Sequence, residues 1–215
     1  AGSRDYFEVR TNGRSQWVGF PGAPQTIILS GFGPYHSENV ALGGVFYNDN
    51  TGPASTTGLN GSYTFHLRVN ESARLGMGLS LGMMQYRLDG TKLELADKGE
   101  PGVPTGIESS IVPDGNFGFY WYTSAYYISL SSYHVFHNRM KKDLFIPTSN
   151  NFGYLVSHYN IIAGYKYTVN DQYEIEPSMQ FQGVQPVPVQ FDFSVKGIYD
   201  NQYWLGVNFR THDAF

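Results

Sequence analysis

The sequence predicts an all-β protein, a transmembrane antiparallel up-and-down β-barrel with about eleven strands in these 215 residues. Three observations predict this fold. Apolar residues recur at every second position over long stretches, and short turn sequences alternate with longer polar links. Aromatic residues make up 16% of the chain, whereas charged residues make up only 15%. A typical globular domain has about 25% charged residues, so this chain has too little charge for an ordinary water-facing surface.

The period of two is clearest where Leu75, Met77 and Leu79 alternate with glycine and serine. This pattern, typical of a β-strand, continues in six stretches: 59–69, 74–83, 158–169, 173–182, 187–196 and 203–210. Five less regular strands fit 5–14, 24–34, 39–48, 116–122 and 126–135. No helix is predicted.

The two faces of these strands indicate what surrounds them. A strand of ~10 residues tilted by ~45° rises about 25 Å, the height of the apolar band of an outer-membrane barrel. One face carries large apolar residues, while the other mixes glycine and serine with charged and amide residues. Eleven or more strands enclose a lumen too wide for a dry core, so the apolar face must look outward into lipid. We therefore expect Leu75, Met77, Leu79, Phe191 and Phe193 to face outward.

The links between the strands predict an orientation. Links after even-numbered strands are tight, near 35–38, 70–72, 123–125, 170–171 and 200–201, whereas long links follow most odd-numbered strands, at 49–55, 89–113 and 137–150. Outer-membrane barrels have short periplasmic turns and long external loops, which places the amino terminus in the periplasm and the 89–113 loop outside. The odd strand number and the strand-exit pattern of 210–215 predict one barrel spanning 1–215 that is cut at its carboxyl end, with 12–14 strands when complete.

Several functional classes are excluded or disfavoured. The net charge of −4 argues against a nucleic-acid partner, and the absence of cysteine excludes thiol catalysis and cysteine metal sites. His134 and His137 would lie on opposite faces of a strand, which is wrong for a shared metal ion. The acidic residues of the 89–113 loop match no calcium-loop spacing, and no nucleophile elbow appears. We predict no enzyme, no catalytic residues, no cofactor and no metal.

The segment 16–24 is the sharpest local feature, and it has two interpretations. Trp17 could anchor a partner in an external binding loop. Alternatively, Pro21 and Gly22 set an ordinary turn and Trp17 sits in an aromatic girdle at the membrane interface, the commoner place for tryptophan.

Charged residues on the polar face also have two interpretations. They could form a selective pore or a partner socket, or they could pair into a plug that keeps the barrel rigid. Both signs occur in similar number, which favours the plug. These residues are Glu8, Arg10, Arg14, Arg68, Arg74, Glu174, Glu176, Asp192, Lys196 and Arg210.

A set of motifs in a fixed order resembles one family from end to end. They are Ala1–Arg4, Arg14–Thr26 (RSQWVGFPGAPQT), Asn48–Pro53 (NDNTGP), Asn116–Gly118, Pro177–Ser178, Trp204–Arg210 and Asp213–Ala214. In this order they resemble the PorP/SprF family, outer-membrane proteins of the type IX secretion system in Bacteroidota. The motifs Arg14–Thr26 and Asn48–Pro53 supply the candidate partner-binding residues Arg14, Gln16, Trp17 and Asp49.

The resemblance implies a bacterial outer-membrane protein that works by protein–protein binding without chemistry. Its expected task is to tether or escort a secreted surface adhesin with a type B C-terminal domain, or to link to a periplasmic peptidoglycan-binding lipoprotein. Docking of a folded domain or of a β-strand is the expected mechanism. Outer-membrane lipid is the other expected partner. A general porin or nutrient channel is the alternative.

Overall fold

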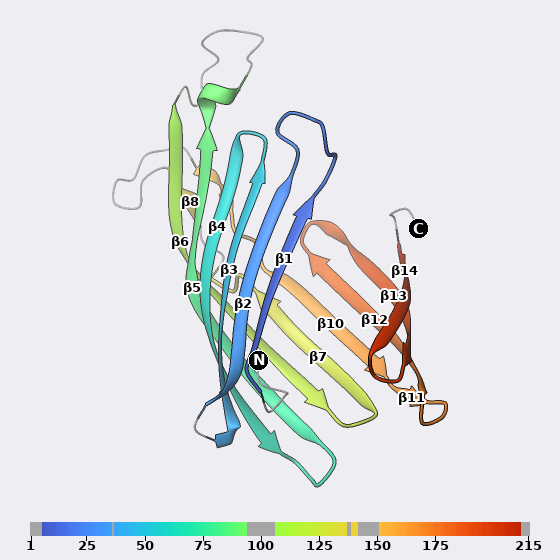
Figure 1. Ribbon diagram of the computed structural model, residues 1–215. Helices are drawn as coiled ribbons and strands as arrows, with labels where there is room; N and C mark the ends of the chain where they lie inside the picture. Colours follow the sequence, from blue (N-terminus) through green and yellow to red (C-terminus); the bar gives the residue numbers. More distant parts are fainter. Residues whose placement is uncertain (1–5, 36, 94–105, 137–138, 142–150, 212–215) are drawn as a thin grey trace. The chain divides into compact units, whose positions relative to one another are not determined.

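A computed structural model describes residues 6–35, 37–93, 106–136, 139–141 and 151–211 (Figure 1). The strands are β1 (Glu8–Ser15), β2 (Gln25–Tyr35), β3 (Ser37–Thr51), β4 (Ala54–Arg68), β5 (Arg74–Asp89), β6 (Ile107–Tyr122), β7 (Tyr126–Tyr133), β8 (Arg139–Lys141), β9 (Asn151–Tyr154), β10 (His158–Tyr165), β11 (Tyr167–Thr168), β12 (Tyr173–Val184), β13 (Val187–Tyr199) and β14 (Tyr203–Arg210). A single turn of 3-10 helix, η1 (Gly90–Lys92), follows β5.

Sequence neighbours pair along one main sheet. Its order is β1-β2-β3-β4-β5-β6-β7-β10-β12-β13-β14, with β11 paired to β12 off this path. β8 and β9 form a separate two-stranded sheet. The path corresponds one to one with the eleven predicted stretches, and strands that follow each other pair antiparallel. The predicted all-β, up-and-down fold is therefore confirmed.

Three details of the prediction are wrong. β3 to β6 are each 15 or 16 residues long, so the expected long link 49–55 is only the turn Gly52–Pro53, and the expected 89–113 link shrinks to 90–106. Backbone hydrogen bonds from Asp89 to Pro53 and from Gly90 to Gly106, both 2.9 Å, extend the ladder past the point where the apolar alternation stops. Backbone N–H and C=O groups need hydrogen-bond partners whatever side chains the strand carries, so strand pairing continues where the apolar alternation stops.

The Asp89 side chain accepts a hydrogen bond from the Thr91 N–H and caps η1, a single 3-10 turn within the link 90–106. The other two corrections concern the stretch 158–169 and the link 137–150. The predicted strand 158–169 is divided into β10 and β11 at Lys166, whose N–H donates to the Ala125 carbonyl at 2.6 Å. Part of the expected 137–150 link forms β8, and the remainder lies outside the described residues.

By its internal contacts the chain forms two compact units. Unit 1 comprises 1–63, 80–115 and 136–155, and unit 2 comprises 64–79, 116–135 and 156–215. No helix in the described part of the chain is long and apolar enough to cross a membrane.

Burial in both units is the reverse of that in a water-soluble protein. In β4, Thr64 and His66 are 6% and 3% exposed, while their neighbours Phe65 and Leu67 are 37% and 46% exposed. Among the described residues the buried hydrophobic set is only Ala41, Ala73, Met84 and Val112, whereas the buried polar set is Thr64, His66, Ser110, Asp114, Ser132, Ser157, Glu176 and Asp192. Successive side chains in a strand point to opposite faces, so the apolar face is the outer one.

The residues singled out from the sequence follow this rule. Leu79 and Phe193 are exposed, and Leu75, Met77 and Phe191 are half-buried. None of the five lies in a dry interior, as the membrane interpretation requires.

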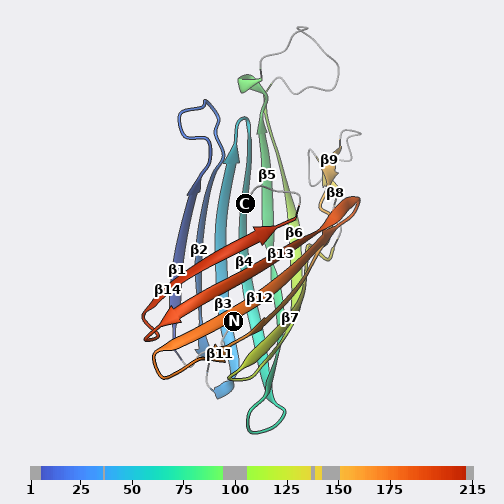
Figure 2. The same ribbon diagram turned by 90° about the vertical axis from the view of Figure 1, so that its right-hand side faces the viewer.

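In unit 2, β12, β13 and β14 lie side by side (Figure 2). Tyrosines of these strands, and of β7 and β10, lie opposite one another at one end of the strands. Tyr173 lies opposite Tyr199, which lies opposite Tyr203, and Tyr126 lies opposite Tyr165. The rings of Tyr173 and Tyr199 have centroids 5.0 Å apart. An outward row of tyrosines where strands turn is the aromatic girdle expected at a membrane interface.

Candidate partner-binding site

The loop 16–24, between β1 and β2, lies beside the turn Gly52–Pro53, between β3 and β4. Both connections stand at the same end of the strands in unit 1 (Figure 1). The Gly52 N–H donates to the Gly22 carbonyl at 2.8 Å. The motifs Arg14–Thr26 and Asn48–Pro53 therefore meet in space.

Local hydrogen bonds hold the loop in one shape. The Gln16 N–H donates to the Pro24 carbonyl at 3.0 Å, Phe20 to Trp17 at 3.1 Å, and Ala23 to Phe20 at 3.2 Å. Gly22 has a φ of 72°, and a Cβ added there would lie 2.9 Å from the Gly52 Cα. Only glycine satisfies both the left-handed backbone and the close approach.

The loop and the turn enclose an open apolar hollow of about 550 Å³, here called the loop hollow. It is lined by Trp17, Phe20, Pro21, Gly22, Ala23, Pro24, Thr51, Gly52 and Pro53. Trp17 and Phe20 are 71% and 73% exposed. Two large aromatic side chains thus stand out from a backbone that is fixed by hydrogen bonds.

A polar row separates the loop hollow from the apolar band on the outer face of unit 1. Ile27 is exposed and lies opposite Asn48, and Gln25 lies opposite Asn50. The Asn48 amide donates to Thr57 Oγ1 at 2.8 Å, and the Asn50 amide donates to Asn48 Oδ1 at 2.6 Å. At ~3.3 Å per residue, Pro24 lies about 10 Å along the strand beyond Ile27.

The four predicted residues are divided between two faces. Trp17 lines the loop hollow, and Gln16 closes the base of the loop through its backbone. Arg14 lies opposite Thr26, and Thr26 lies opposite Asp49, whose carboxylate accepts a hydrogen bond from the Thr26 hydroxyl. This row faces the side opposite to Ile27 and Asn48, so Arg14 and Asp49 do not line the hollow.

The prediction missed Phe20, Thr51 and Pro53 as lining residues. Both motifs were visible, but nothing in the sequence says that they touch. The two motifs come together because β2 pairs with β3 in the register that sets Gln25 opposite Asn50 and Thr26 opposite Asp49.

Six of the ten charged residues singled out for the polar face form ion pairs in the structure. Glu8 pairs with Arg10, Lys196 Nζ lies 2.7 Å from Glu176 Oε2, and Arg210 Nε lies 2.8 Å from Asp192 Oδ1. The Tyr127 hydroxyl also donates to Glu176 Oε1 at 2.9 Å. Each of these three pairs is close to neutral as a unit.

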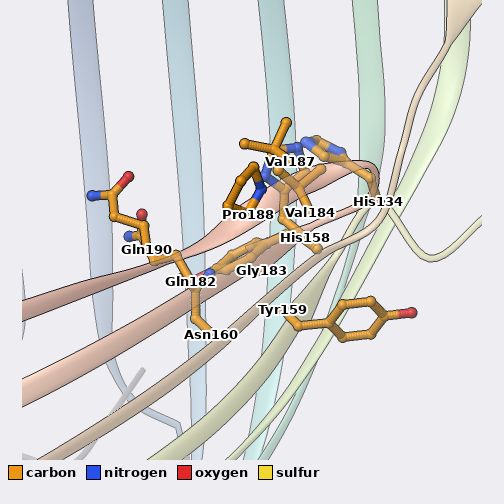
Figure 3. A pocket seen from close by; sticks show the side chains of 11 residues that line it. His134, His158, Tyr159, Asn160, Gln182, Gly183, Val184, Val187, Pro188 and Gln190 are labelled. Atoms are coloured by element: carbon orange, nitrogen blue, oxygen red, sulfur yellow. The ribbon is translucent and has the colours of Figure 1, made fainter. Parts of the chain in front are cut away.

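A second hollow, of about 370 Å³ and with both polar and apolar lining residues, lies in unit 2 beside the β12–β13 turn (Figure 3). Asn160, Gln182 and Gln190, which line it, form one row across β10, β12 and β13. The rings of His134 and His158 lie with centroids 5.7 Å apart, in an edge-to-face arrangement. His137 lies outside the described residues.

The described residues contain no group of three or more histidine, cysteine, aspartate or glutamate side chains that could hold a metal ion. Of the acidic residues in the 89–113 loop, only Asp89 and Glu108 are described.

An antiparallel up-and-down sheet with apolar residues outside and polar residues inside defines the class of transmembrane β-barrel proteins. Within this class, the family model of the type IX secretion system membrane protein PorP/SprF matches residues 1–215, and the chain belongs to that family. It is therefore a membrane component of the type IX secretion system. Comparison with curated proteins finds no match.

Proposed function

We propose that the chain is an outer-membrane component that tethers or escorts a secreted adhesin with a type B C-terminal domain, and that the loop hollow is the contact. The single observation that carries this proposal is the pair of exposed aromatic side chains on a hydrogen-bonded loop. Large rigid aromatic residues bind partners at low entropic cost and dominate interface energies. No catalytic step is involved.

The polar row below the loop supports a partner role for Trp17 over a place in the interface girdle. Girdle residues adjoin the apolar band, as the tyrosines of unit 2 do. Trp17 and Phe20 instead lie beyond a row of amide and hydroxyl side chains, farther from the apolar band. Such a polar row indicates that the surroundings at this level are water and not lipid. A periplasmic lipoprotein would contact the opposite end of the strands.

Binding of a purified type B C-terminal domain from an adhesin of the same genome tests the proposal. Trp17→Ala should weaken binding about 30-fold, as expected for an aromatic anchor worth about 2 kcal/mol. The matched control is Val18→Ala, because Val18 is 83% exposed next to the hollow without lining it. Equal effects of the two substitutions would contradict the proposal.

Conductance in planar bilayers tests the channel alternative. A large, steady open channel would favour a porin, whereas the paired charges of the inner wall favour low conductance. Orientation has its own test: protease added to intact cells should cleave within the link 90–106, and resistance there would reverse the assignment of the loops to the cell exterior.

A further inference from the structure

An apolar hollow of about 280 Å³ opens on the outer face of unit 2, here called the strand hollow. Its walls are Tyr126, Ile128, Tyr165, Met179 and Phe193, from β7, β10, β12 and β13. Ala163 and Pro177 lie between these walls. The volume equals roughly nine waters of the liquid, enough for a length of hydrocarbon chain and far more than a methyl group.

The register explains why the face is hollowed here. One row across the sheet is Ile128, Ala163, Met179 and Phe193, in which a single small residue stands among large ones. The next row is Leu130, Ile161, Phe181 and Phe191, and it is filled throughout. The missing side-chain volume at Ala163 leaves a gap in an otherwise continuous apolar surface.

The surface around the gap identifies what fills it. Ile128, Met179 and Phe193 are each at least 40% exposed, and they continue the outward apolar face that meets lipid. Tyr126 and Tyr165 lie opposite each other at one end of the hollow, within the tyrosine girdle. A phospholipid matches this surface, because its acyl chain would lie against the apolar residues and its head group beside the two tyrosines.

We propose that the strand hollow holds one acyl chain of a phospholipid, with the head group at the level of Tyr126 and Tyr165. The inference rests on the proposed membrane location and goes beyond it, because it assigns a site on this surface to one lipid. Lipid tails are as apolar as the protein face, so the preference over bulk lipid comes from packing contacts. The bound chain exchanges more slowly than its neighbours.

Native mass spectrometry tests the site on the full chain, purified in detergent with palmitoyl-oleoyl phosphatidylethanolamine. We expect one retained lipid per protein. Ala163→Phe fills the gap and should lower the ratio of lipid-bound to lipid-free protein about tenfold. The phenyl ring then takes the place of the acyl chain and its packing contacts. Ala163→Leu should have the same effect, and it keeps the test open should the larger ring prevent folding.

The matched control is Val207→Phe, which adds a ring to the same outward face at a residue that is 72% exposed and lies away from the hollow. Retention in Val207→Phe with loss in both Ala163 variants supports the site. Equal retention in all of them overturns it, as does a change of oligomeric state in the Ala163 variants, because the occupant is then a second copy.

Binding of the adhesin domain separates this inference from the proposed function. Ala163→Phe should bind that domain as the unmodified chain does, and Trp17→Ala should retain the lipid. Loss of lipid from Ala163→Phe with intact adhesin binding supports the lipid site in the strand hollow, independently of whether the proposed adhesin contact is correct.

Discussion

Gly164→Ala should destabilise the protein by removing a hydrogen bond that another residue makes. A Cβ added to Gly164 would lie 2.4 Å from Cζ of Tyr127 and 2.5 Å from its hydroxyl oxygen. The tyrosine ring is the flexible partner and must move. Its hydroxyl then leaves Glu176, which it meets at 2.9 Å and which is only 9% exposed. Loss of a hydrogen bond to a charged group costs about 1.5–3 kcal/mol.

Urea unfolding in detergent micelles, followed by tryptophan fluorescence, measures this loss. Gly197→Ala is the matched control, because that strand glycine has no neighbour closer than the Leu205 carbonyl at 3.9 Å. In a Tyr127→Phe background, which already lacks the hydroxyl, Gly164→Ala should cost less than it does alone. A cost equal to that of Gly197→Ala, or an undiminished cost in the Tyr127→Phe background, would refute the reasoning.

Two further substitutions follow from the charges. Asp192→Asn should cost about 1.5 kcal/mol in the same unfolding assay, near the lower end for a charged hydrogen bond, because the Arg210 side chain is 42% exposed. An unchanged unfolding midpoint would contradict the ion pair. At the end of β5, the hydrogen bond from the Thr91 side chain holds the pKa of Asp89 below its ordinary value of 3.8. Any stability from this carboxyl is thus present above the unfolded pKa and is lost as pH falls through the folded one. Thr91→Val should raise the pKa of Asp89 in an NMR titration, and an unchanged titration would contradict the capping bond.

The sequence was sufficient for the fold because the alternation is long and one-sided. Period two in β5, β12 and β13 specified both the strands and the outward face. Strand ends were less predictable. Apolar and polar residues do not alternate at the end of β3 or at the start of β4, where backbone hydrogen bonds to the neighbouring strand hold the chain instead. The break at Lys166 depends on a contact with Ala125, 41 positions away, which no local pattern reports.

The candidate site was predictable in part. Trp17 and the turn-forming Pro21 and Gly22 stand out by residue type alone. Arg14 and Asp49 belong to the same motifs, yet the alternation of side chains along the strands turns them to the inner face, away from the loop hollow. A sequence motif identifies which segments matter, whereas the face that each residue occupies depends on the strand register.

Two inward tyrosines lie over glycines of a neighbouring strand, one in each unit. In unit 1 a Cβ on Gly58 would lie 2.2 Å from Cζ of Tyr47, and in unit 2 one on Gly164 would collide with the ring of Tyr127. In each case the ring lies across the neighbouring strand in space that a side chain would occupy. Each ring covers the backbone from the inner side, and the Tyr127 hydroxyl donates a hydrogen bond to Glu176. In both units an inward ring thus occupies the space that a side chain at a glycine of the neighbouring strand would fill.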